Sequence, residues 1–225
     1  MRSLRLAPSI LAADFANLGS AVKQATEAGA DYIHVDIMDG VFVPSISMGF
    51  PIIAAIKPYT DRFMDVHLMI IDPIRYIPEC VNAGANIITV HYEACGDKLA
   101  ETLRMIRHYK CKAGLAIKPD TPIEKVVPYL EMIDMVLIMT VEPGFGGQQY
   151  ISACTEKIKA MRQIIDKSDY PQVRIQVDGG INLRTVHTVI QAGADVIVAG
   201  TCVFRNYIAD NIDQFKRVFD MYEYV

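Results

Sequence analysis

The chain contains the stretch Gly29-Ala30-Asp31-Tyr32-Ile33-His34-Val35-Asp36-Ile37. An amphipathic run ends at its glycine and an apolar run follows directly, which is the pattern of a helix followed by a strand. The same unit returns at Gly84-Ala85-Asn86 and at Gly193-Ala194-Asp195, again before an apolar run. A glycine at the end of a helix supplies the positive φ that the backbone needs there. Three copies of one helix–glycine–strand unit predict repeated β–α construction.

Outward from these units, short apolar runs alternate with longer amphipathic ones along the whole chain. The apolar runs are nearly continuous, which is typical of parallel strands that are buried on both faces. Eight strands are predicted, at Leu6–Leu11, Tyr32–Ile37, Phe63–Met69, Ile87–His91, Ala113–Ile117, Met135–Thr140, Val173–Val177 and Val196–Ala199.

The runs between the strands predict helices. Asp14 is a suitable N-cap for the first of them. The segment after Pro122 is interrupted by Pro128, so it predicts only a short helix. The clearest helices are predicted at Phe15–Ala28, Lys98–Tyr109, Thr155–Asp166 and Leu183–Ala192.

Eight strands that each precede a helix predict a single α/β domain over residues 1–225, a (β/α)₈ TIM barrel. The chain has 225 residues, of which 52% are hydrophobic, and this is enough for one large core. An open doubly wound sheet is the alternative. That fold more often has a GxGxxG turn after its first strand, whereas this chain has Ser9-Ile10-Leu11-Ala12.

Composition argues against several classes of partner. Charged residues make up 21% of the chain and the net charge is −4, so we expect no nucleic-acid partner. No apolar run approaches the roughly 18–20 residues that span a bilayer, and Met1–Leu6 is not followed by a signal-peptide core. The five cysteines are scattered and form no CxxC pair. We therefore expect a cytoplasmic protein without a membrane partner.

Polar side chains at the ends of the apolar strands are the candidates for chemistry, because barrel active sites lie at the carboxyl ends of strands. His34 and Asp36 are two residues apart in one strand and face the same side. His67 lies on the next strand, and Asp178 approaches from nearly the opposite wall. This N₂O₂ set predicts one divalent metal ion, Zn²⁺, Fe²⁺, Mn²⁺ or Co²⁺, and disfavours Ca²⁺. The alternative is hydrogen-bonded core histidines with helix-capping aspartates.

Glycine-rich loops follow the last three predicted strands. Backbone N–H groups in such loops can bind an anion, and phosphate sites in barrels usually form around strands seven and eight. We therefore predict a phosphate grip at one edge of the barrel. The alternative is a set of tight turns that merely need positive φ. The three loops are Pro143-Gly144-Phe145-Gly146-Gly147, Asp178-Gly179-Gly180 and Gly200-Thr201.

Together these motifs resemble those of the ribulose-phosphate 3-epimerase family, in the same order and over essentially the whole chain. The matching stretches are Ala7-Pro8-Ser9-Ile10-Leu11-Ala12-Ala13-Asp14-Phe15, His34-Val35-Asp36-Ile37-Met38-Asp39-Gly40, Asp65-Val66-His67-Leu68-Met69, Pro143-Gly144-Phe145-Gly146-Gly147-Gln148 and Val177-Asp178-Gly179-Gly180-Ile181.

The resemblance implies an isomerase that reversibly epimerises D-ribulose 5-phosphate to D-xylulose 5-phosphate at carbon 3, through an enediolate, in pentose phosphate metabolism. It implies Asp36 and Asp178 as the acid/base pair, and a homo-oligomer. It also implies a metal held by His34, Asp36, His67 and Asp178. Substrate contacts would come from Ser9, His67, Gly144, Phe145, Gly146, Gly147, Asp178, Gly179, Gly180, Gly200 and Thr201.

The resemblance also implies that Met38, Met69 and Met139 enclose the reacting carbons, although ordinary packing at the barrel mouth is an equal interpretation. Two loops, Gly40–Gly49 and Gly144–Tyr150, are candidate lids.

Three positions depart from the family pattern. Thr201 replaces a usual serine, and Glu142 and Ser45 replace usual asparagines. A hexulose phosphate such as allulose 6-phosphate is therefore an alternative substrate. A related decarboxylase or aldolase-like synthase would have a lysine beside Asp36, and none occurs in His34–Gly40. A non-catalytic phosphosugar-binding barrel would have lost at least one of the two aspartates.

Overall fold

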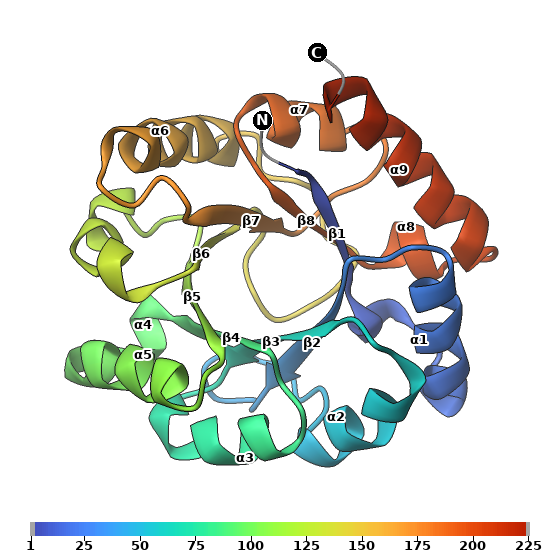
Figure 1. The fold of residues 1–225 in the computed structure, drawn as a ribbon, viewed down its shortest axis with the longest axis horizontal. Helices are drawn as coiled ribbons and strands as arrows, with labels where there is room; N and C mark the ends of the chain where they lie inside the picture. The colour runs from blue at the N-terminus through green and yellow to red at the C-terminus, as the bar shows by residue number, and fades with distance from the viewer. Residues whose placement is uncertain (1–2, 224–225) are drawn as a thin grey trace.

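A computed structural model describes residues 3–223, and within them eight parallel strands form one sheet. Hydrogen-bonded neighbours run in the order β1-β8-β7-β6-β5-β4-β3-β2, and a bridge between Ser9 and His34 joins the two ends. Helices surround the resulting ring (Figure 1). The predicted (β/α)₈ barrel is confirmed. The strands are β1 Arg5–Pro8, β2 Tyr32–Met38, β3 Phe63–Met69, β4 Ile87–His91, β5 Lys112–Ile117, β6 Met135–Met139, β7 Arg174–Asp178 and β8 Val196–Ala199.

The helices outside the ring vary in length. Predicted helices are present at α1, α5, α6 and α7, whereas the sequence analysis assigned no bounds to the others. They are α1 Leu18–Glu27, α2 Phe50–Ile56, α3 Ile77–Asn82, α4 Tyr92–Cys95, α5 Leu99–His108, α6 Cys154–Lys167, α7 Val186–Gln191, α8 Thr201–Phe204 and α9 Ile208–Glu223.

Strand bounds agree with the prediction for β3, β4 and β8, and to within one residue for β2, β5, β6 and β7. The main difference is β1. It ends at Pro8 because Ile10–Ala12 forms a 3₁₀ turn, in which Ala13 N donates to Ile10 O at 3.0 Å.

Two predicted helices differ from the structure in a similar way. The chain after Asp14 begins with a 3₁₀ turn, Phe15–Asn17, and α1 starts only at Leu18, although Asp14 does cap the turn through Ala16 N. The short helix predicted after Pro122 is wrong. Two 3₁₀ segments, Ile123–Lys125 and Val127–Met132, replace it, because the prolines remove the N–H groups that an α-helix needs.

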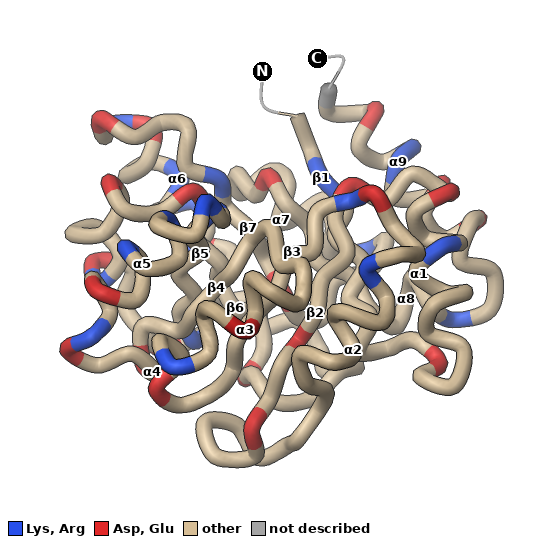
Figure 2. The backbone as a smooth tube through the Cα atoms, turned by 60° about the horizontal axis from the view of Figure 1, so that its bottom comes forward, with Lys and Arg blue, Asp and Glu red and all other residues tan. Residues whose placement is uncertain are grey.

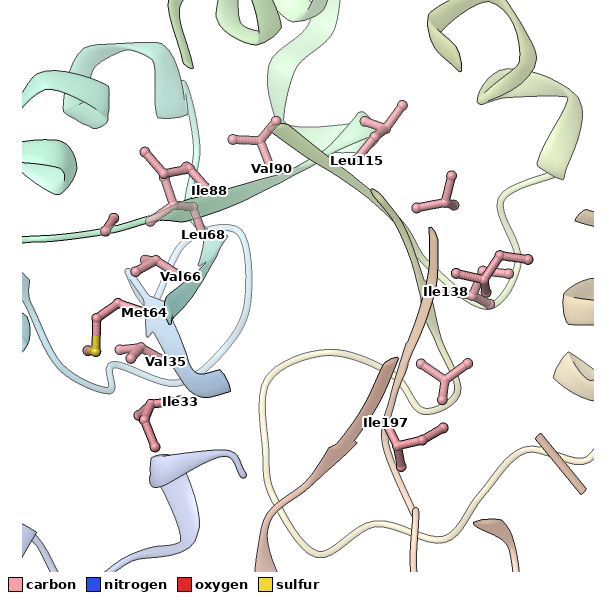
Figure 3. Close-up of a cluster of buried hydrophobic side chains, with 14 of the residues drawn as sticks. Ile33, Val35, Met64, Val66, Leu68, Ile88, Val90, Leu115, Ile138 and Ile197 are labelled. Carbon is pink, nitrogen blue, oxygen red and sulfur yellow. The ribbon is translucent and has the colours of Figure 1, made fainter. Parts of the chain in front are cut away.

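Side chains alternate between the two faces of each strand, so the barrel has one core between strands and helices and another inside the ring. Odd-numbered residues of β2 and even-numbered residues of β3 pack outward against the helices in one large cluster, part of which is shown in Figure 3. Inward-facing positions form smaller apolar clusters, for example Ala7 with Ile87 and Val196. Since His34 and Asp36 are even-numbered residues of β2, they face the barrel interior.

The sequence repeat has a structural cause at the lower rim of the barrel. Gly29, Gly84 and Gly193 have φ values of 96°, 109° and 106°, as predicted for helix ends. The Asx residue two positions later binds the preceding strand twice. Asp31 Oδ2 accepts from Leu6 N at 2.9 Å, and Asp31 N donates to Leu6 O at 2.9 Å. We call this pair of bonds an Asx clasp.

The Asx clasp occurs four times among the described strands. Each clasp joins an odd-numbered strand to the following even-numbered one, so the barrel is built from four similar strand pairs. The other three are Asn86 with Met64, Asp134 with Ala113, and Asp195 with Ile175.

Charged residues of both signs are interspersed over the outer helices, while the strands are largely free of them (Figure 2). Among residues 3–223, no helix has the length and apolar character that crossing a membrane requires.

Candidate metal centre and active site

Four predicted metal ligands converge inside the upper part of the barrel. One ligand atom from each of His34, Asp36, His67 and Asp178 lies within 4.8 Å of the others. His34 Nε2 is 3.3 Å from Asp36 Oδ1 and 3.9 Å from Asp178 Oδ2. His67 Nδ1 is 3.0 Å from Asp36 Oδ1 and 4.0 Å from Asp178 Oδ2. Strands β2, β3 and β7 therefore present two imidazoles and two carboxylates to one point.

The donor set fits a divalent cation. His34 Nδ1 lies 2.8 Å from Asp65 Oδ2, so it carries the proton and leaves a lone pair on Nε2. Nε2 is buried and makes no hydrogen bond with any residue that the structure describes. Ligands bound at about 2.1 Å to one ion lie about 3–4 Å apart, and the four His–Asp distances given above fall in this range. His34 is therefore not a core histidine whose two ring nitrogens are both satisfied by hydrogen bonds.

The two aspartates have opposite shifts of pKa. Burial raises the pKa of Asp178 to about 6, and the nearby Asp36 carboxylate contributes to the rise. Burial also opposes ionisation of Asp36, but the adjacent His34 and His67 imidazoles outweigh it and hold the pKa of Asp36 well below its usual range. For His34, burial is outweighed by the Asp36 and Asp65 carboxylates, which raise its pKa. One carboxyl group is thus strongly ionised while the other retains a proton more readily.

A cavity of about 470 Å³ opens above this cluster. Its volume is within the range of small-molecule sites. Asp36, Asp178 and Ser9 line it, and Ser9 Oγ donates to Asp36 Oδ2 at 2.6 Å. His34 and His67 are fully buried and are not among the lining residues. The contact of His67 with substrate therefore stays a prediction.

Met38, Met69 and Met139 line the cavity and are almost completely buried. Met38 and Met69 pack with Val43 and the partly buried Phe42, from the loop after β2. These contacts are compatible with both interpretations of the methionines, enclosure of a ligand and packing at the barrel mouth.

The three glycine-rich loops meet on one side of the same cavity. Several of their glycines have positive φ, among them Gly179 at 120° and Gly180 at 68°. A Cβ atom on Gly180 would lie 2.2 Å from Tyr150 N, so this glycine also lets two loops pack together. Gly146 has neither restriction, because no atom of the described residues lies within 4 Å of its Cβ position. The need for tight turns thus explains some of these glycines, but not all.

The two candidate lids approach each other over the mouth. A Cβ atom on Gly144 would lie 3.1 Å from Pro44 Cδ, so the loop after β6 contacts the loop after β2. The loop after β2 is stiffened by Asp39, whose Oδ1 accepts from Val41 N and Phe42 N at 2.8 Å each.

Several residues that line the cavity were not predicted from the sequence, among them Arg205, Asn206 and Asn211. These three lie in the connection from α8 to α9 and in α9 itself. Asn211 Nδ2 donates to Val203 O and Arg205 O, at 3.0 and 2.7 Å, and so shapes this connection. A signal was available, since Arg205 is the first basic residue after the predicted phosphate loop Gly200-Thr201.

Comparisons with known proteins show the family of this chain. The model of the ribulose-phosphate 3-epimerase family matches residues 5–204. A protein of Bacillus subtilis named ribulose-phosphate 3-epimerase is 46% identical over 201 residues, which cover 89% of this chain and 92% of that protein. A protein of the same name from Synechocystis is also 46% identical, over 90% of this chain and 88% of its own length.

Solved structures with little sequence similarity share the fold. A 3-keto-L-gulonate-6-phosphate decarboxylase from Vibrio cholerae superposes with a TM-score of 0.74 at 8% identity, over 98% of this chain and 99% of that one. That likeness concerns the barrel alone. The family match over most of the chain and the two close relatives decide the family. The chain belongs to the ribulose-phosphate 3-epimerase family.

Proposed function

We propose that this protein reversibly converts D-ribulose 5-phosphate into D-xylulose 5-phosphate by epimerisation at carbon 3. The observation that carries the proposal is the pair Asp36 and Asp178, which reach one cavity from β2 and β7 on facing walls of the barrel. Epimerisation next to a carbonyl removes a proton from one face of the carbon and returns a proton to the other. Two carboxyl groups on opposite sides can do this, whereas a single base cannot easily reach both faces.

Asp36 would take the proton and Asp178 would supply one, with the roles exchanged in the reverse direction. Their opposite pKa shifts support this division, because one carboxyl group favours the ionised form and the other holds a proton nearer to neutrality. Ser9 keeps Asp36 oriented through its 2.6 Å hydrogen bond.

The planar enediolate that forms between the two proton transfers is negatively charged. A Zn²⁺, Fe²⁺, Mn²⁺ or Co²⁺ ion bound by His34, Asp36, His67 and Asp178 would supply Lewis-acid stabilisation of that charge. Apolar side chains of Met38, Met69 and Met139 would keep water away from the carbon.

The substrate phosphate would bind to backbone N–H groups of the loops after β6, β7 and β8. The phosphate would then bind at one side of the cavity and would position a carbon that it does not itself activate. Arg205 would add a basic side chain to this site, the only one among the described residues that line the cavity.

A coupled assay on ribulose 5-phosphate, with and without defined divalent metals, tests the proposal. Asp36→Asn and Asp178→Asn should each lower kcat by about 10²–10⁴-fold, because each removes one proton transfer. Asp61→Asn is the matched control, since the side chain of Asp61 is 80% exposed on the surface. Near-normal turnover by Asp178→Asn would overturn the two-carboxylate scheme.

The same assay with allulose 6-phosphate compares the hexulose alternative directly. A protein that binds either sugar phosphate but turns over neither would instead be a binding barrel. We also expect a homo-oligomer located in the cytoplasm, and light scattering of the purified protein checks the first of these expectations.

A further inference from the structure

The two ring nitrogens of His67 face different neighbours. Nδ1 faces the metal cluster, 3.0 Å from Asp36 Oδ1, while Nε2 lies 2.8 Å from Nε2 of His91. His91 Nδ1 in turn lies 3.1 Å from Glu93 Oε2. Both imidazoles are fully buried. A continuous line of side chains therefore leads from the metal cluster to Glu93.

Proton positions along this line depend on one another. A gap of 2.8 Å between two neutral imidazole nitrogens holds a single proton, so one nitrogen donates and the other accepts. If His67 Nδ1 offers its lone pair to a cation, its proton must be on Nε2 and be donated to His91. The proton of His91 must then be on Nδ1, where it is donated to the Glu93 carboxylate.

The opposite order blocks the metal. With its proton on Nδ1, His67 would donate to Asp36 Oδ1 and have no lone pair for a cation. His91 would then donate from Nε2, and its bare Nδ1 would face Glu93 Oε2, two acceptors 3.1 Å apart. Two buried acceptors without a proton between them are costly. A carboxylate at position 93 therefore disfavours the order that excludes the cation.

Glu93 is itself held firmly. Its Oε1 accepts from Lys118 N at 2.8 Å and from Thr121 Oγ1, which leaves Oε2 for His91. Burial opposes its ionisation, but the hydrogen bonds from His91 and Thr121 outweigh burial and lower the pKa of Glu93 to about 2. Glu93 therefore acts only as an acceptor toward His91.

We propose that Glu93 is a positioning residue which, acting through His91, holds His67 in the tautomer that can bind the metal. The inference rests on the proposed role of His67 as a ligand. His34 offers a direct comparison, because Asp65 contacts its Nδ1 without an intermediate and leaves Nε2 for the cation. One ligand histidine is oriented by an adjacent carboxylate, and the other by a carboxylate two hydrogen bonds away.

Glu93→Gln tests this with almost no change of shape. The two donors at Oε1 hold the amide oxygen in place, so the amide NH₂ must face His91. His91 then accepts at Nδ1 and donates from Nε2, which drives the proton of His67 onto Nδ1. We expect the apparent Kd for Zn²⁺, measured by competition with a chelator, to rise about 10–100-fold. Thr121→Val is the control. It removes a donor at Oε1 but keeps the bond to His91, so it should bind Zn²⁺ as the unsubstituted protein does.

Nitrogen-15 NMR of histidine side chains in the zinc-loaded, unsubstituted protein provides a second readout that needs no variant. It should show His91 protonated at Nδ1 and His67 at Nε2. Protonation of His91 at Nε2 would overturn the inference, as would equal Zn²⁺ affinity of Glu93→Gln and the unsubstituted protein. Failure of the unsubstituted protein to bind Zn²⁺ would remove the proposed metal role together with the inference. Binding by both proteins with equal affinity would remove the inference alone.

Discussion

At the scale of the residue, the candidate metal centre consists of groups that can bind either a proton or a cation. Asp178 has a pKa raised to about 6 by burial and by Asp36, and His34 has a raised pKa because two carboxylates surround it. A cation must displace protons from such groups when it binds. Affinity for metal and acidity of the solution are therefore linked.

We predict that the affinity for Zn²⁺ falls as the pH drops through about 6. The sign follows from Asp178, because below its pKa the carboxyl group binds a proton that competes with the cation, and above it the group is free to ligate. Protonation of His34 acts in the same direction. Chelator competition at a series of pH values measures the effect, and an affinity that does not change with pH would contradict it.

The sequence identifies these residues because polar side chains at the ends of apolar strands are conspicuous. It could not show that His67 contacts His91 or that Glu93 closes the line. Those contacts depend on the register of β3 against β4, in which His67 pairs with Thr89. A one-residue shift of that register would separate the two rings.

At the scale of the element, the Asx clasp explains why one motif recurs. The repeat in the sequence marks the positions of three of the four clasps, because Gly-Ala precedes Asp31, Asn86 and Asp195. The fourth clasp, at Asp134, follows Met132-Ile133. The 3₁₀ segment before it ends without a glycine, so the Gly-Ala pattern is missing there. Similarly, the start of α1 could not be placed, because a 3₁₀ turn and the first turn of an α-helix have the same apolar spacing.

We predict that Asp31→Asn lowers the free energy of unfolding by about 1 kcal/mol at neutral pH. Asparagine can still accept from Leu6 N, as Asn86 does from Met64 N, but it loses the ion pairs with Arg5 and Lys216. Burial opposes ionisation of Asp31, yet Lys216, Leu6 N and Arg5 lower its pKa. Its contribution is therefore present above the ordinary carboxyl pKa and is lost as the pH falls below it.

Urea unfolding of both proteins at neutral pH and at about pH 3 measures this contribution. The difference between them should shrink in acid. A difference that stays constant across this range would show that the charge of Asp31 is unimportant.

The loop after β7 gives a second prediction at this scale. Gly180→Ala should destabilise the protein by about 1–3 kcal/mol, because φ is 68° and the new methyl group would lie 2.2 Å from Tyr150 N. Gly146→Ala is the control for stability, since its Cβ position is open. Thermal unfolding compares the two variants, and equal midpoints would exclude a steric role for Gly180.

At the scale of the whole molecule, the barrel brings together residues that are distant in the sequence. The candidate ligands come from β2, β3 and β7, and the glycine-rich loops predicted to bind phosphate follow β6, β7 and β8. Counting strands around a ring was enough to predict that these ligands and loops lie at the same end of the barrel. The same count could not assign Arg205, Asn206 and Asn211 to the cavity. Their position depends on the course of the connection between α8 and α9, which has no periodicity to read.

A cation that bridges three strands should stabilise the entire barrel. At a free metal concentration of 100 times Kd, binding adds about 2.7 kcal/mol, which corresponds to a rise in Tm of roughly 5–10 °C for a chain of this size. Thermal unfolding with Zn²⁺ and with excess chelator measures the rise. In Asp178→Asn the rise should be much smaller, and an equal rise there would mean that the cation binds elsewhere.

The closing of the ring has a consequence for how the protein is made. β1 pairs with β8, from Arg5 opposite Val196 to Pro8 opposite Ala199. The first strand to leave the ribosome therefore cannot form this pairing until the last strand has been made. Three of the four metal ligands are synthesised by His67, but Asp178 follows only after β3 to β6 have been translated. A nascent chain therefore holds an incomplete set of ligands for most of its synthesis. The complete set of candidate ligands, and with it the proposed metal site, arises only after β7 has been translated.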